Sequence, residues 1–335
     1  MDHMNKTPLT TIKTDEKVFA VCSNSDSTFF VAGGPGFVSK YGFPSCNLLT
    51  TISTDFICFR CEVSSDDEEL YLKTDMGLRV LSAKTLEEIG AFLKSERIYS
   101  QAYLKRSEQV WLGLASGQLR VLNTRAKTIS TPKTQHGFVV TSLSVAVADS
   151  VVFSSAQDNR LYKWDAKTKK VTIKLELPDS PLCHCVSFDQ QSLFLVVVSE
   201  PLAEFRVSDL SLLRTYARPN SSPVCCMISP ASEQLIASFS DGTVRFLLGS
   251  APPLYFNDYC GQIAVIQHEF LIVASHSVGI VISELPQKQS LFAKLDFLAA
   301  QLDLSEDPPA PAENLRGDFL RLLRKIRDGE FKMST

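Results

Sequence analysis

The segment SSAQDNRLYKWD at residues 154–165 decides the fold of this chain. It contains two short strand-forming stretches separated by a tight turn at Asp158 and Asn159, and the second stretch runs from Arg160 to Trp164. Asp and Asn favour such turns because their side chains bond nearby backbone groups and tolerate left-handed backbone conformations. Strand-forming residues on both sides of a short turn predict an antiparallel hairpin.

The same outline recurs along the chain, as in TDMGLRVL (74–81), SGQLRVL (116–122) and SDGTVRFL (240–247). We align the units on the last residue of the strand after the turn. Seven units then end at Tyr41, Leu81, Leu122, Trp164, Val207, Leu247 and Ile282, and the intervals between these residues are 40, 41, 42, 43, 40 and 35. Each unit also has an apolar strand and a polar turn before the hairpin, and most have a more polar strand after it. Four short strands per unit, repeated seven times, predict an all-β, seven-bladed β-propeller.

The two ends of the repeat region complete each other. PLTTIKTD at 8–15 nearly repeats LLTTISTD at 48–55, which closes the first unit, while the seventh unit has no obvious fourth strand. We therefore predict that residues 8–13 complete the last blade and that the propeller spans residues 1–288. Closure of this kind removes exposed sheet edges, which otherwise promote aggregation.

The unit around residues 136–165 resembles a WD40 repeat. His136, Ser154, Asp158 and Trp164 stand at the spacing of that family's buried tetrad, in which the four side chains form one hydrogen-bonded chain. The other six units lack the Trp, although Asp75 and Asp241 remain in turns. The resemblance implies a propeller that binds other proteins through loops of its narrow face, before each first strand. The candidate partner-binding residues in these loops are Asp55, Glu96, Arg97, Phe138 and Phe256.

After the repeats, residues 289–335 change period and predict a helical extension. Leu291, Leu295, Leu298 and Leu302 recur at helical spacing, and the Pro-rich acidic stretch 305–312 then forms a linker. A second helix is predicted to place its apolar side chains on one stripe, namely Leu315, Phe319, Leu322 and Ile326. This stripe has two interpretations: it packs on the propeller, or it binds a partner protein.

Composition places the chain among folded soluble proteins. Of 335 residues, 44% are apolar and 21% are charged, and 34 basic against 37 acidic residues give a net charge of −3. The longest apolar run has six residues, Leu193–Val198, which is too short to span a membrane, and the first residues do not resemble a signal peptide. We therefore expect an intracellular protein, in the cytoplasm or the nucleus.

Reactive residue types are present without a catalytic or metal-binding pattern. Nearly every cysteine falls on a first strand, where small apolar side chains are needed, so we interpret them as packing residues. Examples are Cys58 and Cys61, Cys183 and Cys185, and Cys225 and Cys226. The glycine-rich stretch at 33–36 opens no helix and no nucleotide-binding motif is found. His184, His268 and His276 lie in predicted strands or turns without a fixed carboxylate or Ser partner. We expect no catalytic residues, no metal and no cofactor.

Three functions remain to be compared. The leading hypothesis is a non-catalytic WD40-like scaffold that holds proteins together in a multiprotein complex. The alternative is a propeller subunit of an RNA-processing or ribosome-biogenesis complex, which would need a basic surface that the near-neutral composition does not require. A propeller hydrolase is disfavoured because the inner strands are rich in Cys, Ser, Val and Ala.

Overall fold

The computed structural model describes residues 10–146, 150–187, 189–198, 200–216, 223–228, 235–239, 241, 243–246, 254–255, 260–266, 270–275 and 279–284. The chain divides into two compact units, Met1–Glu284 and Leu285–Thr335, and every described residue belongs to the first. Phe256 and the predicted helical stripe of Leu315, Phe319, Leu322 and Ile326 lie outside the described residues.

Every helix or strand assigned among these residues is a strand, and neighbouring strands pair antiparallel. Five sheets have four strands each. The first comprises β8 (Ile98–Leu104), β9 (Gln109–Leu114), β10 (Leu119–Asn123) and β11 (Thr128–Ser130), and the second comprises β12 (Val140–Ala146), β13 (Val151–Ala156), β14 (Arg160–Asp165) and β15 (Lys170–Glu176). The third comprises β16 (Pro181–Val186), β17 (Ser192–Val197), β18 (Leu202–Arg206) and β19 (Leu212–Tyr216), and the fourth comprises β20 (Pro223–Ile228), β21 (Leu235–Phe239), β22 (Thr243–Phe246) and β23 (Leu254–Tyr255). The fifth comprises β24 (Cys260–Ile266), β25 (Phe270–Ser275), β26 (Gly279–Glu284) and the N-terminal strand β1 (Thr10–Ile12).

The remaining sheet combines six strands. They are β2 (Ala20–Ser23), β3 (Phe29–Gly42), β4 (Leu48–Val63), β5 (Glu69–Thr74), β6 (Gly77–Ser82) and β7 (Glu88–Phe92). The first part of β4 pairs with β3, from Leu48 to Ile57, with a register shift after Ser53. Its second part pairs with β5, from Cys58 to Val63. One continuous strand therefore ends one group of strands and begins the next.

Strand β3 covers the hairpin of the first repeat unit, the one that ends at Tyr41. Its first part pairs with β2 and its second part with β4, and the Phe43 amide donates to the Thr28 carbonyl at 2.8 Å, so the strand folds back on itself. Pro35 and Gly36 allow the fold-back: proline presets the first turn position, and Gly36 has a φ of +77°, which favours glycine. The glycine-rich stretch thus serves a tight turn within the sheet.

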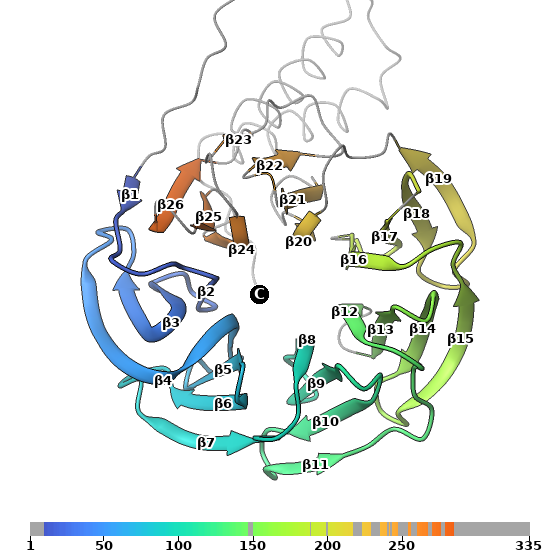
Figure 1. Cartoon of the computed structure of the whole chain (residues 1–335), viewed down its shortest axis with the longest axis horizontal. Coiled ribbons are helices and arrows are strands. Elements are labelled where there is room, and N and C mark those ends of the chain that lie inside the picture. The colour runs from blue at the N-terminus through green and yellow to red at the C-terminus, as the bar shows by residue number, and fades with distance from the viewer. Residues whose placement is uncertain are drawn as a thin grey trace, which may run out of the picture. The chain divides into compact units, whose positions relative to one another are not determined.

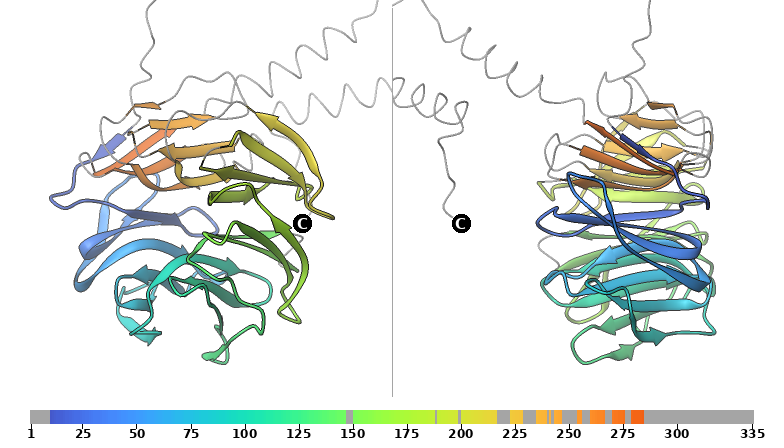
Figure 2. Two further views of the ribbon diagram at one scale, coloured as in Figure 1. Left: turned by 45° about the vertical axis from the view of Figure 1, so that its right-hand side comes forward. Right: turned by 90° about the vertical axis from the view of Figure 1, so that its left-hand side faces the viewer.

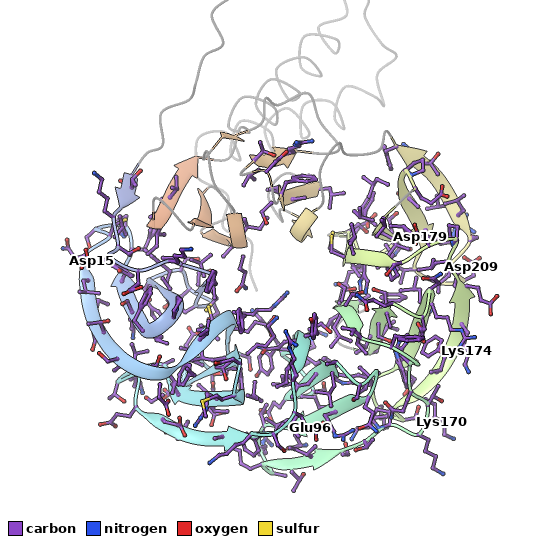
Figure 3. All side chains as sticks on the ribbon, in the orientation of Figure 1. Asp15, Glu96, Lys170, Lys174, Asp179 and Asp209 are labelled. Carbon is purple, nitrogen blue, oxygen red and sulfur yellow. The ribbon has the colours of Figure 1, made fainter. Side chains whose placement is uncertain are left out.

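The sheets are arranged in a ring (Figure 1), and the side views in Figure 2 show them face to face. Strands β2, β8, β12, β16, β20 and β24 lie nearest the middle, and β7, β11, β15 and β19 lie at the outside. From β8 to β24, neighbouring inner strands contact one another in this order, β24 contacts β2, and β2 contacts β4. The outermost strands carry charged side chains, such as Lys170 of β15 (Figure 3), which protect sheet edges from pairing with other chains.

The ends of the ring are joined in two ways. Strand β1 pairs with β26, with Thr10 opposite Ile282 and Ile12 opposite Ile280. Near the centre, the Gln262 side chain of β24 accepts a hydrogen bond from the Cys61 amide at 3.1 Å and donates one to the Cys61 carbonyl at 3.2 Å. The last sheet is therefore bonded both to the N-terminal strand and to an inner strand about two hundred residues away in sequence.

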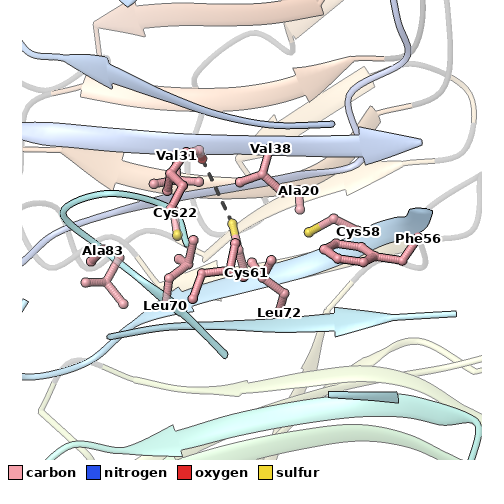
Figure 4. Packing of buried hydrophobic residues seen from close by; sticks show 13 residues of the cluster. Ala20, Cys22, Val31, Val38, Phe56, Cys58, Cys61, Leu70, Leu72 and Ala83 are labelled. Atoms are coloured by element: carbon pink, nitrogen blue, oxygen red, sulfur yellow. Dashed lines mark hydrogen bonds between the residues drawn. The ribbon is translucent and has the colours of Figure 1, made fainter. Parts of the chain in front are cut away.

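The core lies between the faces of neighbouring sheets. In one cluster, Cys22, Cys58 and Cys61 pack with Val31, Leu70 and other apolar residues (Figure 4). Burying apolar surface of this kind stabilises the fold by about 25 cal/mol per Å². The three thiols are free, and they behave as small apolar groups in this environment.

Candidate functional site

The four residues of the WD40-like motif lie in one hydrogen-bonded chain. His136 precedes β12, Ser154 lies in β13, Asp158 lies in the turn that follows, and Trp164 lies in β14. The Trp164 indole N–H donates to Ser154 Oγ at 2.8 Å, Ser154 Oγ lies 2.8 Å from His136 Nε2, and His136 Nδ1 lies 3.1 Å from both carboxylate oxygens of Asp158. The Gly137 amide also donates to Asp158, at 2.8 Å.

One proton arrangement satisfies every member of this chain. Because Nδ1 of His136 faces a carboxylate, it carries the proton and donates, and Nε2 then accepts from the Ser154 hydroxyl. The Ser154 oxygen is left to accept from Trp164. Burial lowers the pKa of His136 more than the neighbouring Asp158 raises it, so the imidazole is neutral near pH 7.

Aromatic rings surround this chain and connect it to the next sheet. The rings of His136 and Tyr162 stack with centroids 4.1 Å apart, and Trp164 meets Trp111 of β9 edge to face at 5.7 Å. Trp111, Tyr162 and Trp164 share one buried cluster. The motif therefore links the segment before β12, through His136 and Gly137, to two sheets.

Of the predicted partner-binding residues, the structure describes Asp55, Glu96, Arg97 and Phe138, which lie before inner strands on the face of the ring that we call the upper face. It carries the segments before the inner strands, and the turns between second and third strands. Asp55 is exposed within β4, Arg97 is exposed directly before β8, and the Phe138 side chain is 63% exposed. Glu96 (Figure 3) differs, because its carboxylate pairs with Arg120 at 3.2 Å and both side chains are largely covered. Glu96 therefore already has an internal partner.

His184 requires a correction. The sequence analysis expected no fixed Ser partner, but Ser144 Oγ lies 2.8 Å from His184 Nδ1, and the His184 amide donates to Ser142 Oγ at 3.2 Å. Both serines lie in β12, next to β16, so the pairing depends on the neighbouring sheet and is invisible in a single unit. Burial lowers the pKa of His184 to about 3, which keeps the ring neutral.

The described residues contain no group of three or more His, Cys, Asp or Glu side chains that could hold a metal. Burial raises the pKa values of the Cys58 and Cys61 thiols, so neither is a thiolate near pH 7. Within the same part of the chain, no helix is long and apolar enough to cross a membrane.

Comparison with known families gives one match. Residues 210–246 match the family described as WD domain, G-beta repeat, and this segment contains β19 to β22. The chain carries a WD40 repeat. The resemblance predicted from the sequence is thereby confirmed, although the match falls two units after the one that carries the four-residue motif. WD40-repeat domains generally act as non-catalytic scaffolds for protein interactions. No curated protein matches the sequence.

Two residues of the upper face were missed by the sequence analysis. Phe59 of β4 and Tyr99 of β8 are each 40% exposed, although both lie in inner strands. The signal was available, since Phe19, Phe59 and Tyr99 follow one another at intervals of 59 − 19 = 40 and 99 − 59 = 40 residues. They occupy one position of the repeat.

Proposed function

We propose that this WD40-repeat protein is a seven-bladed β-propeller that acts as an intracellular, non-catalytic scaffold in a multiprotein complex. The blade count is supported by β3 and β4. If the folded-back β3 counts as two strands and the two parts of β4 count separately, the six-stranded sheet becomes two four-stranded blades. Together with the other five sheets, this gives seven blades. The N-terminal strand at 8–13 would complete the last blade, as supported by the pairing of β1 with β26.

One observation supports the scaffold function. Among the described residues, the exposed large apolar side chains lie on the upper face or on the outermost strands, and none lies in a turn of the opposite face. The upper face has Phe59, Met76, Tyr99, Phe138 and Val198. Exposed apolar side chains gathered on one face of a protein are typical of interaction sites. Phe138 is the strongest anchor because it is the most exposed of these residues and the hydrogen-bonded motif holds its backbone segment.

Photo-crosslinking tests this function directly. A benzoylphenylalanine at position 138 of the full chain should give discrete adducts with other proteins in cells. The same group at position 212, an exposed Leu of the outer strand β19, serves as the matched control. Equal adduct patterns at 138 and 212, or none at 138, would contradict a scaffold role for the upper face.

The C-terminal segment 289–335 is a second proposed contact. Its apolar stripe of Leu315, Phe319, Leu322 and Ile326 is suited to a groove on a partner protein. A chain of residues 1–304 should lose a subset of the partners recovered with the full chain. Recovery of the same partners with both chains would instead support packing of the stripe within this protein.

A further inference from the structure

A β-bulge recurs at one position of the inner strands. In β4, Cys58 and Arg60 pair with adjacent residues of β5, so Phe59 is an extra residue between them. The same shift leaves Tyr99 as the extra residue in β8 and Thr141 in β12. Leu182 of β16 and Val224 of β20 follow the same pattern. Such bulges redirect a side chain out of the regular alternation of a strand.

The bulged residues differ around the ring. Aromatic side chains occur in β4 and β8, and Phe19 before β2 stacks on Phe59 with centroids 5.8 Å apart. Further along the chain the position holds Thr141, Leu182 and Val224. We call Phe19, Phe59 and Tyr99 the aromatic arc. It occupies only the part of the ring formed by β2 to β8.

Two cations belong to the aromatic arc. The Lys73 ammonium lies 5.7 Å from the centre of the Phe59 ring and donates to the Tyr99 carbonyl at 2.8 Å. The Arg97 guanidinium lies 5.3 Å from the centre of the Tyr99 ring. No ion pair among the described residues involves Arg97, so an approaching carboxylate would meet no competing acid in direct contact with it.

Three carboxylates in the two sheets that carry the arc already have partners. Glu62 pairs with Arg60 at 3.2 Å and accepts from Gln101, and Glu96 pairs with Arg120. The carboxylate of Asp75 accepts from the Ile57 amide at 2.7 Å. Asp55 is exposed on the same face.

We propose that the aromatic arc, with Lys73 and Arg97, binds a short protein segment in which Asp or Glu lies next to an apolar side chain. This inference rests on the scaffold function and specifies its partner. Cations supply charge complementarity to the carboxylate, and the positive edges of the aromatic rings favour the same group. The apolar neighbour would be buried against Phe59 and Tyr99. A nucleobase would need free ring faces for stacking, but faces of Phe59 and Tyr99 are already covered by Phe19, Lys73 and Arg97. Two cations also give little affinity for a phosphate backbone. The geometry therefore favours a peptide over a nucleic acid.

A peptide-display selection on the full chain tests the proposal. The probe is a library of random 12-residue peptides, and a 12-nucleotide oligouridylate is measured in parallel. Selected peptides are then measured by fluorescence anisotropy against Arg97→Glu and Tyr99→Ala. The matched controls are Arg125→Glu and Leu212→Ala, which change exposed residues away from the arc. Circular dichroism and urea unfolding verify that each variant is folded.

We expect the selected peptides to be enriched in Asp or Glu beside an apolar residue. Arg97→Glu and Tyr99→Ala should each weaken binding by about tenfold or more, and the controls by less than about twofold. Peptides without acidic enrichment, or equal binding to all variants, would overturn the assignment of the arc while leaving the scaffold function intact. Binding of oligouridylate without selection of any peptide would overturn both.

Discussion

Replacing Ser154 with Ala tests the hydrogen-bonded motif most sharply, because this hydroxyl bonds to two buried groups. Removing Oγ leaves the Trp164 indole N–H and the His136 Nε2 without partners, while the packing of the strand changes little. An unsatisfied buried polar group costs about 1–3 kcal/mol, so we expect the free energy of unfolding to fall by about 2–4 kcal/mol. The neighbouring variant Ser155→Ala is the control. Ser155 is equally buried, but its hydroxyl partner Thr141 also bonds the Ser155 carbonyl, so the loss should be about 1 kcal/mol or less.

Urea unfolding followed by circular dichroism measures these differences. The only two tryptophans of the chain, Trp111 and Trp164, lie in the same cluster, so their fluorescence provides a second probe for variants that keep both. In a Trp164→Phe background the indole N–H is absent, and Ser154→Ala should then cost about 1–2 kcal/mol less. Trp164→Ala itself should cost about 3–5 kcal/mol, since its side chain is fully buried. If Ser154→Ala were no more destabilising than Ser155→Ala, or additive with Trp164→Phe, the motif would not act as a connected chain.

Three further changes have defined outcomes. Below pH about 6.5 an unfolded histidine gains a proton, whereas buried His184, with a folded pKa of about 3, does not. The free energy of unfolding should therefore fall by about 1.6 kcal/mol between pH 6.5 and 5 through this residue, and His184→Gln should reduce the pH dependence measured by urea unfolding. Gly117 has a φ of +84°, and a Cβ there would lie 2.4 Å from the His136 carbonyl oxygen, so Gly117→Ala should destabilise the protein by about 2 kcal/mol or more. Gly137→Ala is the control and should have little effect, because a Cβ at Gly137 would have no heavy atom closer than 3.8 Å. Equal urea midpoints for the two variants would contradict this prediction. Deleting residues 1–13 removes the partner of β26 and should cause aggregation in light scattering, while a soluble monomer of normal stability would show that the ring is closed otherwise.

The sequence predicted features that depend on one repeat unit and missed those that depend on two. The spacing of His136, Ser154, Asp158 and Trp164 was visible because all four belong to one unit. The pairing of His184 with Ser144 joins two units, and their proximity depends on how neighbouring sheets pack, so no local pattern reveals it. The continuity of β4 was also missed, because the alignment of repeats assigns its first part to the end of one unit and its second part to the start of the next.

The two most distinctive features of the protein lie in different parts of the ring and place different demands on the sequence. The motif of β12 to β14 needs buried polar groups that satisfy one another, and such a network tolerates little change because each loss leaves an orphaned partner. The aromatic arc needs only a bulge and an exposed ring, and the bulge is present in β12 and β16 as well, where Thr141 and Leu182 occupy it. The backbone therefore places a bulged residue at the same position in several blades. In our proposal, the type of side chain at that position determines which blades bind the acidic peptide. Thr141→Tyr, with Leu212→Tyr as the exposed control, should extend the arc into β12 and strengthen binding of the selected acidic peptides. Unchanged affinity would show that the cations Lys73 and Arg97, which β12 lacks at these positions, are what recognise the partner.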